Sequence, residues 1–386
     1  MLRFTTAGES HGQALVSILE GLPAGLPLLA SHIDAQLVRR QQGYGRGRRM
    51  QIEQDAVELL SGVRAGETIG SPIAMLIRNR DWKNWQEIMD PAPRPEDPKR
   101  KRAVTRVRPG HADLTGLLKY DRDDARDILE RASARETTAR VAAGAICRQL
   151  LEQFGVSIGS HVIRLGDIDA DRPDPFPADI NTAADASPLR TLDGGAEARM
   201  IERIDVVKRE GNTLGGVAEV VATGLCVGLG SHTSWDRKLD GRIGQAMMSI
   251  PAVKGVEIGM GFAAAAATGM DVHDEMDPAP ERAIAGGVRR RTNRAGGLEG
   301  GMTTGEPLVV RVAMKPISTL MKPLATVDVA TGERAQATAE RSDVTAVPGM
   351  GVIAEAMLAI VLAQALLEKF GGDSLREVRH NYDGYL

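Results

Sequence analysis

The sequence predicts an α+β fold. Apolar residues recur with helical period in separate groups, and strand-like apolar runs follow one another between those groups. The 43 glycines are spread along the whole chain and mark turns and long loops between the runs. This grouping favours α+β over the regular alternation of an α/β protein. With 386 residues, the chain is long enough to bury a sizeable core.

The elements are predicted from these patterns in chain order. Two short strands open the chain at 2–7 and 13–21, and the first helix follows at 31–42, where Ser31 is a plausible cap. A long helix is expected over 124–155, which ends at a glycine, and a second over 352–372. Further strands are expected at 71–79, 156–166, 215–230, 253–262 and 306–316.

Two polar stretches stand apart from these elements. Residues 80–101 contain four prolines and many charges, which is typical of a domain linker or of a flap over a site. We favour a mobile flap, because the basic residues at its end run directly into the RPGH motif at 108–111. Residues 167–188 are interpreted as a surface insertion.

Composition excludes several classes of protein. The two cysteines, Cys147 and Cys226, have no C-x-x-C spacing, and the histidines show no ligand pair, so we expect neither disulfides nor a metal site. The N-terminus has no signal or transit pattern, so we expect a cytoplasmic protein. The most apolar segment, 354–367, is too short to span a membrane and is interpreted as a buried core helix.

Arginine is concentrated in four segments, 39–49, 99–111, 130–140 and 286–294, although the net charge is −3. Clustered arginine in a slightly acidic protein indicates local anion sites, while paired surface charge is the plain alternative. Aromatic residues make up 3% of the chain, and no nucleic-acid-binding motif accompanies the basic runs, so no nucleic-acid partner is expected.

The segment 8–12, GESHG, matches the G-x-S-x-G pattern of serine hydrolases. A nucleophile elbow joins a strand to a helix and needs an oxyanion donor from an earlier loop, but only seven residues precede Gly8 and a strand follows Gly12. We therefore expect a polar turn between two strands, with Ser10 and His11 side by side, and no serine nucleophile.

Histidines beside glycine and arginine recur in SHG (10–12) and RPGHAD (108–113). A proton donor next to an arginine clamp indicates elimination or phosphoryl chemistry, although a histidine taken alone is more often a structural hydrogen-bonding group than a catalyst. The loop 294–307 exposes backbone N–H groups suited to a phosphate or a flat cofactor. No P-loop occurs, and the G-x-G-x-x-A match at 259–264 lacks a following amphipathic helix, so it is interpreted as chance.

Nine motifs follow one another along almost the whole chain: GESHG (8–12), RRQQGYGRGRR (39–49), RPGHADLTGLLKY (108–120), RASARETTARVAAGA (131–145), GLGSHTSWDRKLDGRI (228–243), IPAVKGVEIG (250–259), GGLEGGMTTGEP (296–307), KPIST (315–319) and ERSDVTAVP (340–348), the last followed by the terminal apolar helix. Together, and in this order, they resemble the chorismate synthase family. Nine collinear motifs are far more specific than any single pattern.

The resemblance implies a 1,4-anti-elimination of phosphate from 5-enolpyruvylshikimate 3-phosphate that yields chorismate and requires reduced FMN. It places catalytic roles on three residues: His11 as acid for the departing phosphate, His111 as partner of the anionic reduced flavin, and Asp343 as the base that takes a proton from flavin N5. Substrate contacts are expected from Ser10, Arg40, Arg46, Arg49, Arg108 and Arg135. Cofactor contacts are expected from Arg131, Ala132, Ser133, Pro251, Ala252, Gly300, Lys315, Pro316, Ile317, Ser318, Thr319 and Arg341.

Some points stay open at this stage. Arg40 and Arg46 are assigned either to the substrate or to a reduced pyridine nucleotide, so NADPH is a possible reductant and an FMN-dependent NAD(P)H flavin reductase is the alternative function. Ala132 and Pro251 stand where relatives can have polar residues, so their flavin contacts would be made through the backbone. The resemblance also implies one domain over 1–386, a sandwich of antiparallel sheets around a helical layer, and a homotetramer.

Overall fold

A computed structural model describes residues 1–47, 54–93, 102–338 and 342–386. The N-terminal sheet is antiparallel, and its strand order is β1-β2-β6-β3. Its strands are β1 (Arg3–Ala7), β2 (Ala14–Glu20), β6 (Ile73–Arg78) and β3 (Val57–Leu59). Burial alternates along β2 and β6, so one face of each strand packs against the core.

The second sheet is also antiparallel, and its strand order is β10-β15-β9-β7-β8. Its strands are β10 (Val253–Ile258), β15 (Leu308–Met314), β9 (Gly216–Thr223), β7 (Ser157–Leu165) and β8 (Ile168–Asp169). Four two-stranded hairpins complete the strands of the described chain: β4 (Val63–Arg64) with β5 (Glu67–Thr68), β11 (Met276–Pro278) with β12 (Val288–Arg290), β13 (Leu298–Glu299) with β14 (Met302–Thr303), and β16 (Ala325–Val327) with β17 (Arg334–Gln336).

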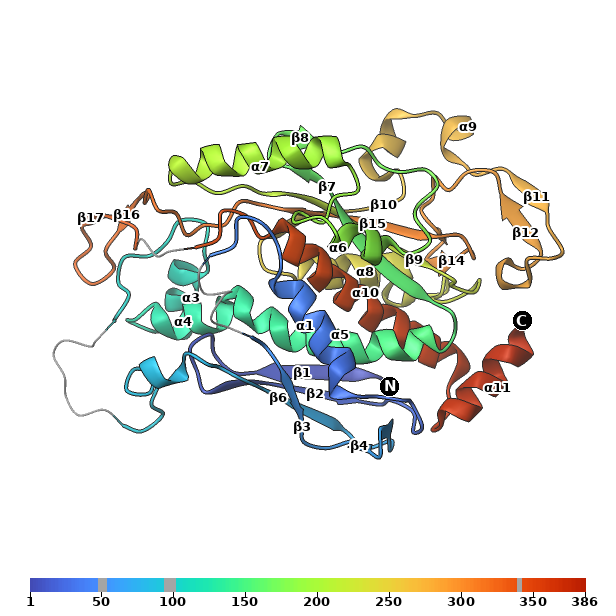
Figure 1. The fold of residues 1–386 in the computed structure, drawn as a ribbon, viewed down its shortest axis with the longest axis horizontal. Coiled ribbons are helices and arrows are strands. Elements are labelled where there is room, and N and C mark those ends of the chain that lie inside the picture. Colours follow the sequence, from blue (N-terminus) through green and yellow to red (C-terminus); the bar gives the residue numbers. More distant parts are fainter. Residues whose placement is uncertain (48–53, 94–101, 339–341) are drawn as a thin grey trace.

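A helical layer lies between the two sheets (Figure 1), made of α1 (Ala30–Gln41), α5 (Thr137–Glu152) and α10 (Val347–Phe370). Helix α5 packs against β2 on one side and α10 on the other, and α10 contacts β7 and β9 of the second sheet. The other α-helices of the described residues are α3 (Asp113–Tyr120), α4 (Arg126–Ala132), α6 (Ile180–Asp185), α7 (Gly194–Arg209), α8 (Leu239–Met248), α9 (Gly269–Val272) and α11 (Leu375–Tyr385).

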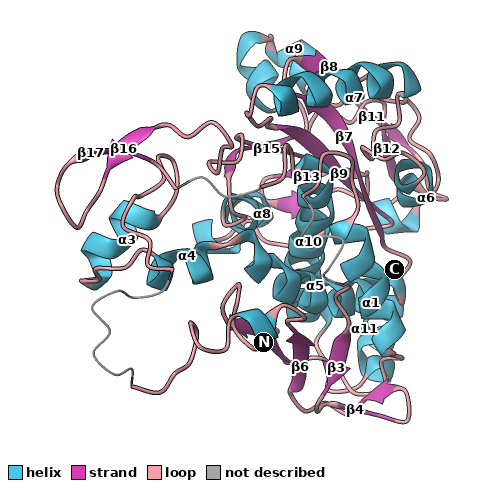
Figure 2. Ribbon diagram, turned by 60° about the vertical axis from the view of Figure 1, so that its left-hand side comes forward, coloured by secondary structure: helices cyan, strands magenta, loops and turns pink. Residues whose placement is uncertain are grey.

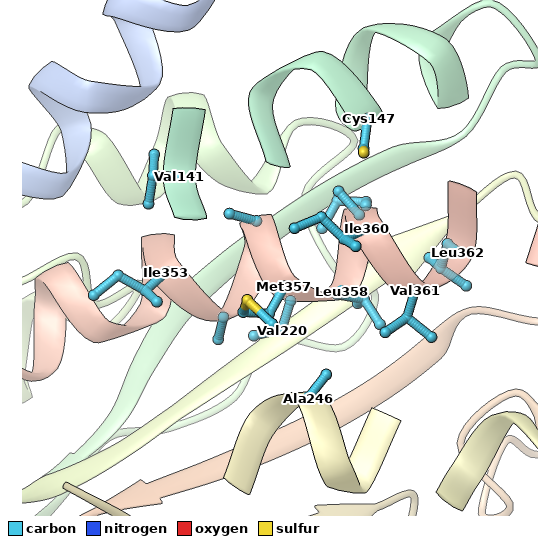
Figure 3. Packing of buried hydrophobic residues seen from close by; sticks show 14 of the residues in the cluster. Val141, Cys147, Val220, Ala246, Ile353, Met357, Leu358, Ile360, Val361 and Leu362 are labelled. Atoms are coloured by element: carbon cyan, nitrogen blue, oxygen red, sulfur yellow. The ribbon is translucent and has the colours of Figure 1, made fainter. Parts of the chain in front are cut away.

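Helix α10 is the centre of the core. It is the one described helix long and apolar enough to span a membrane by composition, yet 89% of its most apolar window is buried inside the protein. Its side chains pack in all directions, against α5 on one side and against β9 and α8 on the other (Figure 3). The prediction of a buried core helix is therefore confirmed.

The predicted α+β class and the sandwich around helices are confirmed, with three corrections to the helices. Helix α1 begins at Ala30 with Leu29 at the N-cap, so Ser31 lies inside the helix and does not cap it. The predicted helix 124–155 is two helices, α4 and α5, because Ser133 between them has an extended backbone (φ −64°, ψ 144°) and caps the short 3₁₀ turn that follows. Helix α10 begins at Val347, five residues before the predicted start, because Pro348 is tolerated in the first turn.

Candidate active site

A cavity of about 610 Å³ opens at one end of the helical layer. Its walls come from the β1–β2 turn, the loop after α1, the loop before α3, the α4–α5 junction, the turn before β10, the segment after β15 and the start of α10. Fifteen predicted site residues line it: Ser10, His11, Arg40, Arg46, Arg108, His111, Ala132, Ser133, Pro251, Ala252, Lys315, Ile317, Ser318, Thr319 and Asp343.

The β1–β2 turn holds Ser10 and His11 in a fixed backbone. Gly8 has φ +103°, and a Cβ there would meet the Ala14 carbonyl at 2.4 Å, so only glycine fits. The Asn79 side chain donates to the carbonyls of Ser10 and Gly12, at 2.8 and 3.0 Å. Strand β2 follows the turn, so Ser10 does not lie on a nucleophile elbow, as predicted.

Glu130 holds His11 from α4. Its carboxylate accepts from the His11 backbone N–H at 2.8 Å and lies 2.8 Å from Nδ1. Burial of Glu130 raises its pKa, but the hydrogen bonds from His11 and the charge of Arg126 outweigh burial, so this pKa lies below its usual value. An ionised Glu130 favours a proton on His11 Nδ1 and leaves Nε2 as the atom for proton transfer.

A second histidine–carboxylate pair lies at the start of α3, where His111 precedes the helix and Asp113 is its first residue. His111 Nδ1 is 2.5 Å from Asp113, which is fully buried and also accepts two hydrogen bonds from the Arg108 guanidinium, at 2.8 and 3.0 Å. Arg108 in turn donates to Thr319 across the cavity. Burial raises the pKa of Asp113, but the hydrogen bonds from His111 and Arg108 hold it well below its usual range.

The last turn of α1 and the loop after it bring two arginines to the cavity, Arg40 and Arg46. Arg40 is buried and donates to Thr137 Oγ1 at 3.0 Å and to the Ala134 carbonyl at 2.8 Å. Arg46 Nε lies 3.4 Å from Asp343 Oδ2, and the Gly47 N–H donates to Asp343 Oδ1 at 2.6 Å. The Asp343 carboxylate is thereby oriented at the cavity edge.

The segment after β15 contributes a lysine and a turned backbone. Lys315 Nζ donates to the Gly110 carbonyl at 2.9 Å, and its backbone N–H donates to the carbonyl of Ala252, which has φ +68°. Burial and the charge of Lys254 lower the pKa of Lys315. Two neighbouring ammonium groups create a positive potential that an anion would relieve.

The other predicted residues lie elsewhere. Within the described chain, four do not line the cavity: Arg131, Arg135, Gly300 and Pro316. Arg135 donates to buried Asp55 at 2.5 Å, and Arg131 reaches Thr6 and the Gly8 carbonyl, supporting the β1–β2 turn. Gly300 lies in the β13–β14 turn. Arg49 and Arg341 lie outside the described residues.

Sequence reasoning missed the two buried carboxylates. Glu130 was part of a run selected for its arginines, and Asp113 stood inside the RPGHAD motif without a role. The signal for Asp113 was the H-x-D spacing, since a carboxylate two residues from a histidine can orient its ring. No comparable signal pointed to Glu130, which is 119 residues from His11 in the chain.

Comparisons with known proteins agree with this architecture. A family model described as chorismate synthase matches residues 2–367. The chorismate synthase of Symbiobacterium thermophilum is 57% identical and the alignment covers 100% of this chain and 98% of that protein, while that of Mycobacterium avium is 57% identical with 100% and 96% covered. A crystal structure of chorismate synthase is 45% identical with a TM-score of 0.80, covering 100% of this chain and 97% of that one. The chain belongs to the chorismate synthase family.

Proposed function

We propose that this lyase of the shikimate pathway removes phosphate from 5-enolpyruvylshikimate 3-phosphate by 1,4-anti-elimination, with reduced FMN as cofactor. The observation that carries the proposal is the pair of histidines in one cavity, each with Nδ1 held by a buried carboxylate, beside Arg40, Arg46 and Arg108. The substrate carries a phosphate and two carboxylates, and guanidinium groups bind such anions through paired hydrogen bonds.

His11 acts as the acid in this proposal. Its imidazolium donates through Nδ1 to Glu130, and the Nε2 proton is delivered to the departing phosphate oxygen. Ser10, its neighbour in the turn, binds the substrate by hydrogen bonding. Arg40, Arg46 and Arg108 orient the anionic groups, and the family resemblance implies the same role for Arg49. The resemblance also implies a role for Arg135. Because Arg135 donates to Asp55, we assign it to holding the neighbouring arginines in place.

The cavity fits a flavin. The lining includes the apolar side chains of Leu129, Ile250 and Met350, which suit a flat ring system, and Lys315, whose amino group suits a phosphate. Ala132, Ser133, Pro251, Ala252 and the segment 315–319 would hold the group, as would Arg131, Gly300 and Arg341 by resemblance. Bound reduced FMN supplies electron density to the allylic system. His111, whose Nδ1 is held by Asp113, would hold a proton at Nε2, and the Asp343 carboxylate would be the group that accepts one.

An anaerobic assay tests the proposal. Purified protein is mixed with 5-enolpyruvylshikimate 3-phosphate and chemically reduced FMN, and chorismate and phosphate are followed together, with oxidised FMN and oxidised FMN plus NADPH as parallel arms. Equal formation of both products only with reduced flavin supports the proposal. Activity in the NADPH arm would add a flavin reductase activity.

Single variants test the assigned roles. His11→Ala and His111→Ala are each expected to lower kcat by about 10²- to 10⁴-fold, the usual contribution of a general acid or base. Asp343→Asn is expected to lower kcat while substrate still binds. Wild-type turnover in any of these variants would remove the role given to that residue.

We further propose a homotetramer, the assembly that the family resemblance implies. Trp235, Phe262 and Met270 are at least 82% exposed in the single chain and are apolar side chains that a subunit interface would bury. Light scattering on the purified protein measures its mass directly. A monomeric mass at assay concentration would contradict the tetramer.

A further inference from the structure

The indole of Trp85 stacks on the imidazole of His11. The ring centroids are 3.8 Å apart and the planes differ by 26°. Trp85 directly follows the short 3₁₀ helix Trp82–Asn84, in the segment after β6, and its Nε1 donates to Asp81 at 2.8 Å. We propose that Trp85 is a positioning residue that fixes the plane of the His11 ring for proton transfer. This inference rests on the proposed function of His11 as the acid.

The hydrogen bond to Glu130 does not fix that plane by itself. It tethers one ring atom, Nδ1, which lies 2.8 and 3.0 Å from the two carboxylate oxygens, and the angular tolerance of a hydrogen bond still lets the ring rock about that atom. A flat indole at van der Waals distance restricts this rocking, because it would bring the edge of the imidazole into the indole face. The carboxylate and the indole therefore both restrict where Nε2 points.

Trp85 is itself held by cations. The guanidinium carbons of Arg102 and Arg126 lie 4.3 and 5.1 Å from the centre of its ring. Arg126 also donates to Glu130 at 3.0 Å, so the contacts close a circuit that runs from His11 to Glu130, Arg126, Trp85 and back to His11. Each of these four residues contacts two of the others, so the orientation of His11 depends on all of them.

Trp85 acts through His11 in this arrangement. Within the described chain, His11 lines the cavity and Trp85 does not. Loss of the indole should therefore lower the rate of the chemical step and leave substrate binding nearly unchanged.

Kinetics of six proteins test the inference: wild type, Trp85→Ala, Trp85→Phe, Trp82→Ala, His11→Ala and the double variant His11→Ala with Trp85→Ala. Trp85→Ala is expected to lower kcat about tenfold with a change in KM below about twofold, since a misplaced catalytic group loses rate more than affinity. Trp85→Phe keeps a flat face and is expected to recover kcat to within about threefold of wild type. Trp82→Ala, in the same segment, is the matched control and is expected to keep wild-type kcat.

The double variant separates positioning from a general structural effect. If Trp85 acts through His11, its removal costs nothing further once His11 is gone, so the double variant equals His11→Ala. Additive losses, a loss confined to KM, or wild-type kcat in Trp85→Ala would each overturn the role of Trp85. No turnover by wild-type protein with reduced FMN would instead overturn the proposed function.

Fluorescence tests the stack without activity. In a protein whose sole tryptophan is Trp85, made with Trp82→Phe and Trp235→Phe, His11→Leu is expected to change the indole emission. A protein that retains only Trp82 is expected to show no response to the same substitution. Unchanged Trp85 emission would show that the rings are not stacked in solution and would overturn the inference.

Discussion

Asp113 orients two side chains of the cavity, Arg108 and His111. It is fully buried and accepts from both Arg108 and His111. Asp113→Asn is expected to lower kcat/KM about 100-fold, because an amide offers N–H groups to partners that are themselves donors and no longer fixes the histidine tautomer. It is also expected to destabilise the fold by about 3 kcal/mol, since the Arg108 charge remains buried without its counter-charge.

The pH dependence of that loss has a definite sign. Because the native pKa of Asp113 lies well below its ordinary value of 3.8, its ionisation stabilises the native state above that value and this contribution disappears as the pH falls through the lower native pKa. Urea unfolding should therefore give a constant difference between wild type and Asp113→Asn from neutral pH down to about pH 4 and a smaller one below it. Asp127→Asn, which breaks an exposed pair with Arg122, is the control and should cost under about 1 kcal/mol at every pH.

Sequence reasoning identified the two histidines that line the cavity, and it missed the side chains that hold His11 in place. His11 and His111 stand in short motifs, so local chemistry identified them. Glu130 and Trp85 contact His11 from 119 and 74 positions away, and only the packing of α4 and of the segment after β6 brings them there. A side chain that acts through another leaves no local pattern.

Helices α5 and α10 are in direct contact at their backbones. A Cβ built on Gly144 of α5 would meet Ala356 of α10 at 2.4 Å from its Cβ and 2.7 Å from its carbonyl oxygen. Gly144→Ala is expected to destabilise the protein by about 1–3 kcal/mol, because overpacking outweighs the gain of about 1 kcal/mol in helix propensity. Gly244→Ala in α8 is the matched control, since its Cβ meets no described atom within 4 Å, and should stabilise slightly. Equal effects in thermal unfolding would contradict this packing.

Glu355 connects α10 to three neighbouring segments through ion pairs with arginines. It is buried, and Arg39, Arg148 and Arg190 donate to its carboxylate from α1, α5 and the segment before α7. Burial raises its pKa, but the charges of these arginines lower it to about 2. Glu355→Gln is expected to cost about 3–5 kcal/mol in urea unfolding at neutral pH, because the arginines lose their counter-charge.

Glu368 is the matched control on the same helix. It pairs with Arg242 at the surface, and Glu368→Gln should cost under about 1 kcal/mol. If the two glutamine variants were equally stable, Glu355 would not be the counter-charge of the cluster.

The helices also show what periodicity can and cannot predict. Apolar spacing found α1, α5 and α10, and alternation found the main strands of both sheets, because burial on one face fixes those patterns. The break at Ser133 was not predicted, because the surrounding sequence forms helices well. The break places Ser133 in the lining of the cavity. The amphipathic helix α7 was also missed, although Asp193 caps its start.

At the scale of the whole molecule, the cavity joins the two halves of the sandwich. His11 comes from the β1–β2 turn of the first sheet, Lys315 directly follows β15 of the second sheet, and Asp343 precedes α10. Figure 2 shows the strands of the two sheets on opposite sides of α5 and α10. A ligand that contacts all of these must bind the folded chain and not the unfolded one. Ligand binding is therefore coupled to the stability of the entire sandwich.

Substrate binding in the cavity should therefore stabilise the folded protein. At 100 times its Kd, 5-enolpyruvylshikimate 3-phosphate should raise the free energy of unfolding by about 2.7 kcal/mol, measured by urea titration with and without the compound. Arg108→Ala should lose most of this increment at the same concentration, because a cavity cation is removed. Arg291→Ala, which removes an exposed arginine paired with Glu275 and Asp277 beside β12, should retain it. An equal increment in both variants would place the substrate outside the cavity, whereas loss in Arg108→Ala alone ties the anion to the wall that also holds His111.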